Sequence, residues 1–232
     1  FIDSFYLSFK LAFISTLIAL VIGIPAAYGM SRYSVTGKKL LKSFFLSPTI
    51  VPGIVIGYAL FQFLVIKLQI PVFQGLLLGH FLVVLPYIIR IVGASLEQFD
   101  FSIEEVAWSL GCNKIQTFFK IVMPLSKPVI ATISLLTLLA RWNDWNTALI
   151  YIKSTNLYSL QYLLQKILRE AEFVKNMAES SPVAGVDLDL SNLPSVTIRF
   201  AMCMVAAGPM LIIFPFFQKY FAKGLTVGAV KG

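Results

Sequence analysis

Few side chains in this sequence could carry out covalent chemistry. The chain has a single histidine, His80, and no H-E-x-x-H sequence or Cys/His cluster typical of a metal site. It also has no G-x-x-x-x-G-K-[ST] sequence, so we expect no phosphate-binding loop for ATP. His80 and Asp144 are the only credible pair for an enzyme acting inside a membrane. We therefore predict no catalytic residues and no metal site, and treat an intramembrane enzyme as a remote alternative.

The hexapeptide RWNDWN, residues 141–146, places polar and aromatic side chains in an otherwise apolar segment. Three pairs have the i, i+3 spacing of helical neighbours: Arg141 with Asp144, Trp142 with Trp145, and Asn143 with Asn146. Charges within a membrane are costly and normally face a cavity or an opposite charge. Two interpretations stay open. Either Arg141 and Asp144 pair and brace the helix, or the six residues line a solute path whose tryptophan faces and hydrogen-bonding groups suit a sugar.

The composition indicates which kind of element must position these residues. The 232 residues are 58% hydrophobic and only 13% charged, with a mean hydropathy of +0.82. This charge is too little to cover the surface of a soluble domain of this length. The net charge of +8 is not interleaved as a nucleic-acid-binding stripe, because the basic residues gather between apolar segments. The sequence predicts an integral membrane protein without a nucleic-acid partner.

Five apolar segments reach the length of about 20 residues that a helix needs to cross a bilayer. They are residues 5–30, 44–66, 71–94, 128–150 and 195–217. Glycine or proline occurs in all of them, which neighbouring helices can tolerate and which predicts kinks around a pathway. We expect an all-α, polytopic transmembrane bundle and a single domain over residues 1–232.

The lysines and arginines of the connecting segments predict the orientation. Residues 31–43 hold four basic side chains and no acid, and the tail after residue 217 holds three. Residues 151–194 hold four basic and five acidic side chains. Since basic connections stay in the cytoplasm, residues 95–127 are expected there and residues 151–194 outside. Five spans leave the N-terminus outside, so a further span is expected upstream of Phe1.

A polar insert, EEVAWSLGCNKIQTFFKIVMP, occupies residues 104–124 between two apolar segments. Ser102 and Glu105 form an S-x-x-E capping box, which predicts a helix beginning at Ile103. Gly111 is expected to end this helix, and Asn113 to cap a second one that continues to Pro124. An apolar stripe with helical spacing follows one face: Ile103, Val106, Ala107 and Leu110.

The short amphipathic helix could contact either lipid or a protein. Helices that lie on a lipid surface usually present lysine or arginine to anionic headgroups. This one carries Glu104 and Glu105 near its N-terminus, where the helix dipole favours negative charge but anionic lipid would repel it. The sequence therefore predicts a protein partner.

The spacing within the insert resembles the EAA motif, EAA-x3-G-x9-I-x-LP, of permease subunits of binding-protein-dependent ABC importers. The matching residues are Glu105-Val106-Ala107, Gly111, Ile121 and Met123-Pro124, with valine and methionine in place of alanine and leucine. The resemblance implies that the short helix is a coupling helix that docks on an ATPase subunit. The residues expected to couple to the ATPase are Glu104, Glu105, Val106, Ala107, Leu110, Gly111, Ile121 and Pro124.

The same resemblance implies an assembly. The five predicted spans correspond to the last five of the usual six. A second permease subunit, either a copy or a paralogue, would complete the pathway in the bacterial plasma (inner) membrane. Two ATPase subunits would bind ATP and Mg, so this chain needs no cofactor, and an extracytoplasmic solute-binding protein would deliver the solute. Transport would proceed by alternating access.

The two halves of the chain resemble different branches of these permeases. The W-N-D sequence, the segment LQYLLQKIL and the ending FFQKYFAKGLTVGAVKG resemble carbohydrate-uptake permeases. SPTIVPGIVIG and LPYIIRIVGASL resemble the polyamine, ferric iron and phosphonate branch, and Leu110 stands where sugar permeases more often carry aspartate. We expect a sugar or oligosaccharide as the solute, with the other branch as the alternative and a channel as a remote one.

Overall fold

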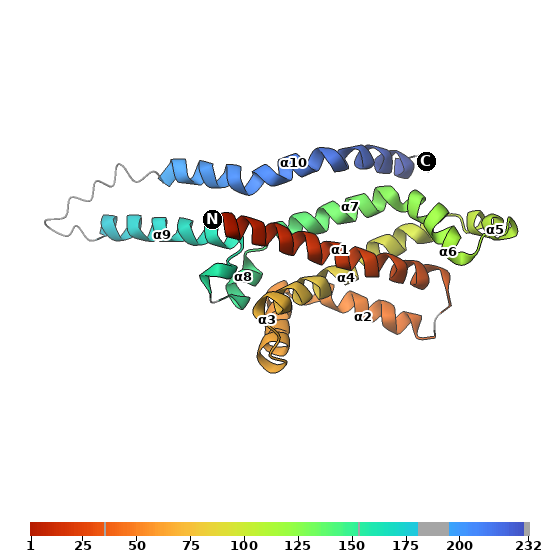
Figure 1. The fold of residues 1–232 in the computed structure, drawn as a ribbon, viewed down its shortest axis with the longest axis horizontal. Helices are drawn as coiled ribbons and strands as arrows, with labels where there is room; N and C mark the ends of the chain where they lie inside the picture. The colour runs from red at the N-terminus through yellow and green to blue at the C-terminus, as the bar shows by residue number, and fades with distance from the viewer. Residues whose placement is uncertain (35, 153, 181–194, 230–232) are drawn as a thin grey trace.

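The computed structural model describes all residues except 35, 153, 181–194 and 230–232. The described residues form helices and connections, without a β-strand, which confirms the all-α prediction. Long helices run along the longest axis of the molecule (Figure 1) and include α1 (Ile2–Arg32), α4 (Val72–Gln98), α7 (Met123–Trp142) and α10 (Ser195–Ala229). Within the described residues, these four regions contain the helices that are long and apolar enough to cross a membrane.

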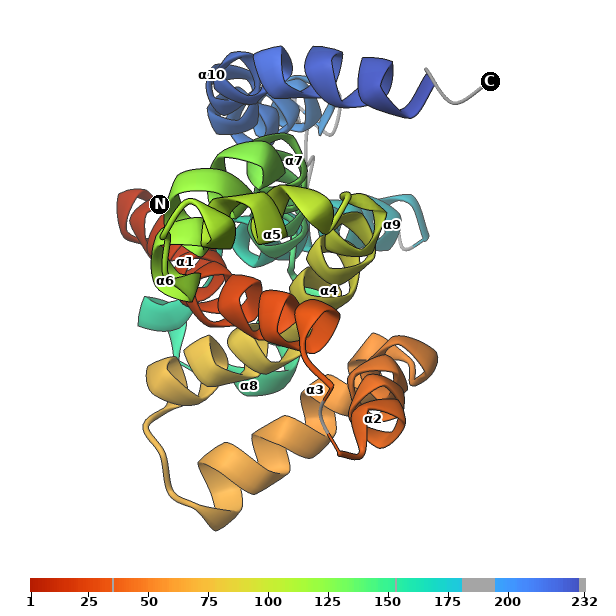
Figure 2. The ribbon, with the colours of Figure 1, turned by 90° about the vertical axis from the view of Figure 1, so that its right-hand side faces the viewer.

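Small residues bring α1 and α4 into close contact. Along α1, Ser15, Ala19, Gly23 and Ala27 recur every four residues and are buried. A Cβ atom on Gly23 would lie only 2.7 Å from Cγ2 of Ile88 in α4, so only glycine allows this approach. Such small-residue stripes drive helix packing in membranes, where burying apolar surface stabilises little. Seen along the long axis (Figure 2), α10 lies on α7, which in turn covers the α1–α4 pair.

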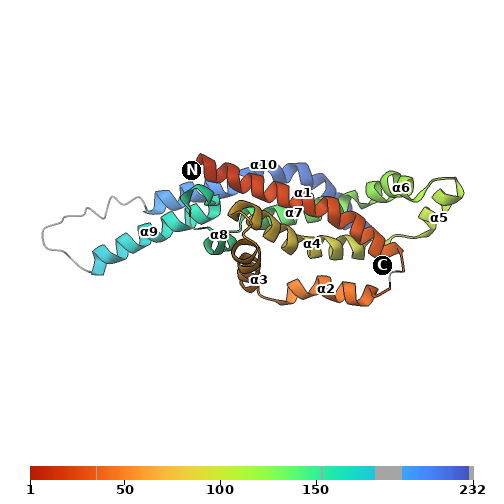
Figure 3. The same ribbon diagram turned by 60° about the horizontal axis from the view of Figure 1, so that its bottom comes forward.

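The predicted span 44–66 is not one helix. Its residues belong to α2 (Lys38–Ile50), α3 (Gly53–Phe61) and a π-helical turn, η1 (Gln62–Lys67). Val51 and Pro52 between α2 and α3 are extended, with ψ of 136° and 132°. Proline disfavours helical geometry in the residue before it, and the Gly53 that follows is a poor helix former. The chain therefore changes direction, and α3 is turned away from the line of α2 (Figure 3).

The predicted span 128–150 is also interrupted. Helix α7 ends at Trp142, and after a short break α8 covers Asn146–Tyr151. The break falls inside RWNDWN, so these six residues do not lie on one continuous helix. At its other end, α7 continues from α5 (Ser102–Ser109), α6 (Lys114–Thr117) and a π-helical turn, η2 (Phe118–Val122). The ring of Pro124 would clash with the carbonyl of residue 120 in a regular helix, and the wider π turn lies at this point.

The two ends of the bundle contain different helices, which identifies the cytoplasmic end. The end of α1, the basic helix α2, and helices α5 and α6 lie at one end, which is the cytoplasmic one by the distribution of basic residues (Figure 1). The N-terminus, α8 and α9 (Leu160–Ser180) lie at the other. The external connection predicted as a loop over 151–194 thus contains a 3-10 turn, η3 (Thr155–Leu157), and α9. Residues 181–194 lie outside the described residues.

Candidate functional site

Helix α5 begins differently from the prediction. The backbone amide of Ser102 donates to Oδ1 of Asp100 at 3.0 Å, and the Ser102 side chain makes no cap. The helix already starts at Ser102, one residue before the predicted start at Ile103, so the predicted Ser102–Glu105 capping box is wrong. The hydrogen bonds from Ser102 lower the pKa of Asp100.

The end of α5 follows the prediction closely. Gly111 has a φ of +87°, a left-handed conformation that a side chain would strain. Its amide donates to the carbonyl of Trp108, and the amide of Cys112 reaches back to the carbonyl of Ala107 at 3.0 Å. These two bonds form a Schellman motif, which closes the helix. Asn113 then caps α6 in a reciprocal capping box with Gln116, which confirms the predicted start of the second helix.

The two adjacent glutamates of α5 have different surroundings. Glu104 is only 2% exposed, and its carboxylate accepts from Nε of Arg32 at 2.7 Å and from the hydroxyl of Tyr28 at 2.6 Å. Glu105 is exposed. Neighbouring residues on a helix point about 100° apart, so one carboxylate faces the bundle while the other faces away. The expectation that both carboxylates are presented outward is wrong for Glu104.

Most of the apolar stripe of α5 lies on the surface. Ile103, Val106 and Leu110 are 43%, 57% and 80% exposed, whereas Ala107 is buried against the bundle. We call Ile103, Glu105, Val106 and Leu110 the α5 face. This is an amphipathic surface of the kind that a helix inserts into a groove of another protein.

The last two residues expected to couple to the ATPase, Ile121 and Pro124, are not part of the α5 face. Ile121 lines a small pocket together with Arg32 and Glu104, so it contacts the inner side of α5. Pro124 is exposed in the first turn of α7. The coupling role of these two residues stays a prediction.

A second candidate site is a cavity of about 470 Å³ between α3, α4 and the α7–α8 break. Glycines of α3 and α4 form part of its wall and leave room near the backbone. Its polar lining residues are His80, Arg141, Asn143, Asp144, Asn146, Thr147 and Tyr151. The structure thus brings four of the six residues of RWNDWN to the cavity, together with three polar residues that were not predicted as solute ligands.

Asp144 holds the polar residues of the cavity in place. Its carboxylate lies 3.3 Å from Nη1 of Arg141 and accepts from both the amide and the hydroxyl of Thr147. The same Nη1 lies 3.1 Å from Nδ1 of His80. Because a guanidinium only donates, Nδ1 of His80 must accept, and the proton of this neutral ring is on Nε2. The Arg141–Asp144 pair of the bracing interpretation is therefore present, and it also lines the cavity.

The two tryptophans face other helices and are not among the lining residues. Trp142 is 1% exposed, and its Nε1 donates to the carbonyl of Ala206 in α10 at 2.9 Å. The ring of Trp145 is covered by the guanidinium of Arg169 in α9, 5.1 Å from its centroid. Because the helix ends at Trp142, the two tryptophans do not share one helical face, although Arg141 and Asp144 still pair at the predicted i, i+3 spacing. The tryptophan faces therefore do not line this cavity.

Tyr151 is a cavity residue that the sequence analysis missed. It is 2% exposed, and its hydroxyl has no hydrogen-bond partner among the described residues. A Cβ atom on Gly79 would lie 3.0 Å from this hydroxyl, so the glycine makes room for it. The glycines at 75 and 79, spaced four apart in an apolar helix, were the signal that another group approaches α4 there.

The chain is similar to known membrane transport proteins. Residues 19–227 match the family described as "Binding-protein-dependent transport system inner membrane component". The chain is 33% identical to the polygalacturonan/rhamnogalacturonan transport system permease protein YtcP of Bacillus subtilis (strain 168), over 94% of this chain and 73% of that protein. It is 28% identical to the trehalose transport system permease protein SugB of Mycobacterium tuberculosis (strain CDC 1551 / Oshkosh), over 97% and 75%.

Solved structures share the fold. A bacterial ABC transporter involved in the import of the acidic polysaccharide alginate superposes with a TM-score of 0.71 at 22% identity, over 95% of this chain and 75% of that one. The MetNI methionine ABC transporter gives a TM-score of 0.56 at 14% identity, over 88% and 93%. The family match covers most of the described bundle, including both candidate sites. The chain belongs to the inner-membrane components of binding-protein-dependent transport systems, and is a multi-pass permease subunit of a bacterial ABC importer.

Proposed function

We propose that this permease subunit imports a saccharide, and that the cavity at the α7–α8 break lies on its path. The observation that carries the proposal is the lining, which combines hydrogen-bond donors and acceptors. The side chains of His80 and Arg141 donate, that of Asp144 accepts, and the amides of Asn143 and Asn146 do both. Sugar hydroxyls are themselves both donors and acceptors. The names of the relatives, a polygalacturonan/rhamnogalacturonan and a trehalose permease, support the same class of solute.

The net charge of the cavity lining favours a saccharide over a polyamine, ferric iron or a phosphonate, the solutes of the other permease branch. Its charged lining residues are Arg141 and Asp144, which are 3.3 Å apart and neutralise each other. A polyamine would require excess negative charge, and a phosphonate excess positive charge. A site without net charge suits a ligand that is held mainly by hydrogen bonds.

The α5 face would make the contact with the ATPase. Its exposed apolar side chains, Ile103, Val106 and Leu110, suit insertion into a hydrophobic groove, and Glu105 adds a charge at its edge. In the proposed assembly, two permease subunits form the pathway, and two ATPase subunits bind ATP and Mg. A solute-binding protein delivers the saccharide to the opposite end, and ATP-driven closure rocks the helices between two states.

Uptake by the reconstituted complex tests the solute class. The permease would be co-expressed with its own partner permease, ATPase and binding protein, and purified into proteoliposomes with ATP inside. A panel of trigalacturonate, trehalose, spermidine, ferric citrate and methylphosphonate would be offered with the binding protein. We expect ATP-dependent uptake of a saccharide. ATP-dependent uptake of spermidine, iron or methylphosphonate instead would overturn the proposal.

A further inference from the structure

A buried ion pair joins the end of α1 to the inner side of α5. The side chains of Arg32 and Glu104 are 10% and 3% exposed, and Nε of Arg32 lies 2.7 Å from Oε1 of Glu104. The hydroxyl of Tyr28, one turn earlier on α1, donates to the other carboxylate oxygen at 2.6 Å. Both oxygens of Glu104 are therefore bonded to α1, from residues that are more than 70 positions away in the sequence.

Residues on either side of α5 enclose this cluster. Nη2 of Arg32 lies 3.4 Å from the carbonyl oxygen of Phe99, and its guanidinium lies over the ring of Phe101, 5.3 Å from the centroid. The ring of Tyr28 packs on Phe118 of η2, with centroids 4.9 Å apart. Charge-assisted bonds in such an enclosed site are strong and directional, and removing one partner leaves a buried charge uncompensated.

We propose that Tyr28, Arg32 and Glu104 form a latch that makes α5 move as one body with α1. The proposal rests on the proposed docking of an ATPase on the α5 face. Glu105 lies on that face, while Glu104 is a positioning residue on the opposite side. Without the latch, α5 would be held mainly by its two chain connections. With it, a displacement of α5 reaches α1 directly, and then α4 through the small-residue stripe.

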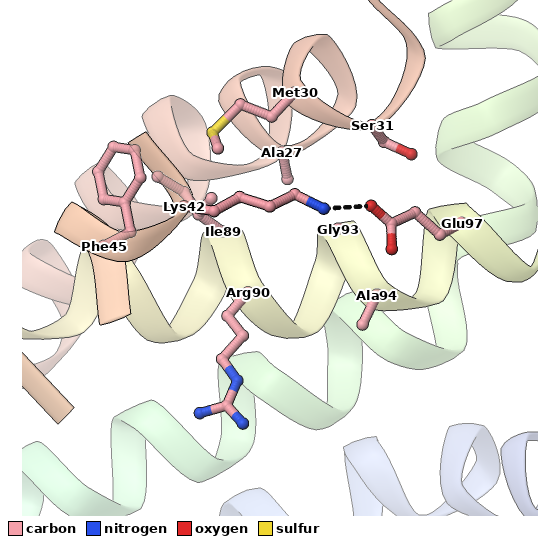
Figure 4. A pocket seen from close by; sticks show the side chains of 10 residues that line it. All are labelled: Ala27, Met30, Ser31, Lys42, Phe45, Ile89, Arg90, Gly93, Ala94 and Glu97. Carbon is pink, nitrogen blue, oxygen red and sulfur yellow. Dashed lines mark hydrogen bonds and ion pairs between the residues drawn. The ribbon is translucent and has the colours of Figure 1, made fainter. Parts of the chain in front are cut away.

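A second ion pair offers a matched control on the same half of the molecule. Lys42 of α2 and Glu97 of α4 lie 2.8 Å apart beside a cavity of about 280 Å³ (Figure 4). Each side chain is 48% exposed. Exposed pairs of this kind hold helices together only weakly. Glu97→Gln removes the same type of charge as Glu104→Gln, and it breaks the bond to Lys42 without removing any hydrogen bond of the latch.

Distances between spin labels test whether α5 and α1 move together. Labels would be attached at Ser34→Cys, just after α1, and at Ser109→Cys on α5, with Cys112 and Cys203 replaced by serine. Both labelled residues are exposed. In the assembled transporter we expect one narrow distance distribution that stays narrow when Mg-ATP and vanadate are added. Glu104→Ala and Arg32→Ala should broaden it, whereas Glu97→Gln should not.

The stimulation of ATP hydrolysis by the binding protein tests the functional consequence. We expect Glu104→Ala to reduce this stimulation about tenfold, within the usual range for coupling between distant sites. The Glu104→Ala/Arg32→Ala double variant should be no worse than either single one, because both remove the same link. If an alanine variant does not assemble, Glu104→Gln and Arg32→Lys replace it in both measurements.

Two outcomes would overturn the latch. One is a narrow label distance together with normal stimulation in the Glu104 variants, and the other is an effect of Glu97→Gln as large as theirs. These outcomes are distinct from a failure of the proposed function. If wild-type permease did not co-purify with its ATPase, the docking proposal would fail before any variant was compared.

Discussion

At the scale of single residues, the cavity lining contains two buried polar atoms without a hydrogen-bond partner among the described residues, Nε of Arg141 and the hydroxyl of Tyr151. The hydroxyl of Tyr151 is buried without a partner among the described residues, although the ring packs against Phe61 with centroids 5.0 Å apart. Leaving a buried hydroxyl unpaired costs about 1–3 kcal/mol. Because Tyr151 lines the cavity on the proposed solute path, we expect its hydroxyl to pair with a sugar hydroxyl during transport.

The substitution Tyr151→Phe separates the effect of the hydroxyl on stability from its effect on transport. We expect the subunit to become equally or more stable, by up to about 1–3 kcal/mol, because an unpaired buried hydroxyl is removed. Saccharide uptake should fall several-fold at the same time. Thermal unfolding of the purified complex measures the change in stability, and uptake into proteoliposomes measures the change in transport. Tyr87→Phe is the control, since Tyr87 is 40% exposed and does not line this cavity. A loss of stability with normal uptake would make Tyr151 a purely structural residue.

At the scale of elements, the sequence predicted the apolar segments better than their continuity. Pro25, Pro86 and Pro128 lie inside helices, whereas Pro52 separates two. Hydropathy does not distinguish these cases, because it measures transfer into lipid and not the backbone geometry. The Pro52-Gly53 dipeptide combines a residue that cannot donate with one of low helix propensity, and such pairs mark breaks.

The contact between α1 and α4 depends on Gly23. Gly23→Ala would place a Cβ atom 2.7 Å from Ile88, and we expect the bundle to lose about 1–3 kcal/mol through overpacking. Gly29→Ala in the same helix meets no atom within 4 Å and should be neutral or gain about 0.5–1 kcal/mol from helix propensity. Thermal unfolding of the two purified variants would compare them. Equal melting temperatures would show that α1 and α4 are not closely packed at Gly23.

The orientation of α5 shows what a short stretch of sequence leaves undetermined. The end of α5 at Gly111 and the cap of α6 at Asn113 depend on residues within four positions, and both were predicted, although the reciprocal bond with Gln116 was not. The inward direction of Glu104 depends on Arg32, which lies 72 positions earlier. Two adjacent glutamates look equivalent in sequence until the tertiary partner of one is known. The direction of Trp142 likewise depends on a distant partner, because its Nε1 donates to the carbonyl of Ala206 in α10.

At the scale of the whole molecule, the positions of α5 and η3 at opposite ends predict opposite exposure to the two sides of the membrane. In cells expressing a variant with Cys203→Ser and Cys112→Ser, a cysteine at Thr155 should react with a membrane-impermeant maleimide. A cysteine at Ser109 should react only after the cells are opened. Both positions are exposed in the subunit. The reverse pattern of labelling would invert the assigned orientation.

The pairing of Arg141 with Asp144 has an electrical consequence. Moving one elementary charge through a membrane potential of 100 mV involves about 2.3 kcal/mol of work. Arg141 lies in the last turn of α7 and Asp144 in the break that follows, with their charged groups 3.3 Å apart, so a movement of this end of α7 would carry the pair through the field together. Their charges cancel, and His80 adds none. For an uncharged sugar, this pair would add no net charge to the movement of the cavity, whether it is loaded or empty, and so would not make uptake depend on the membrane voltage.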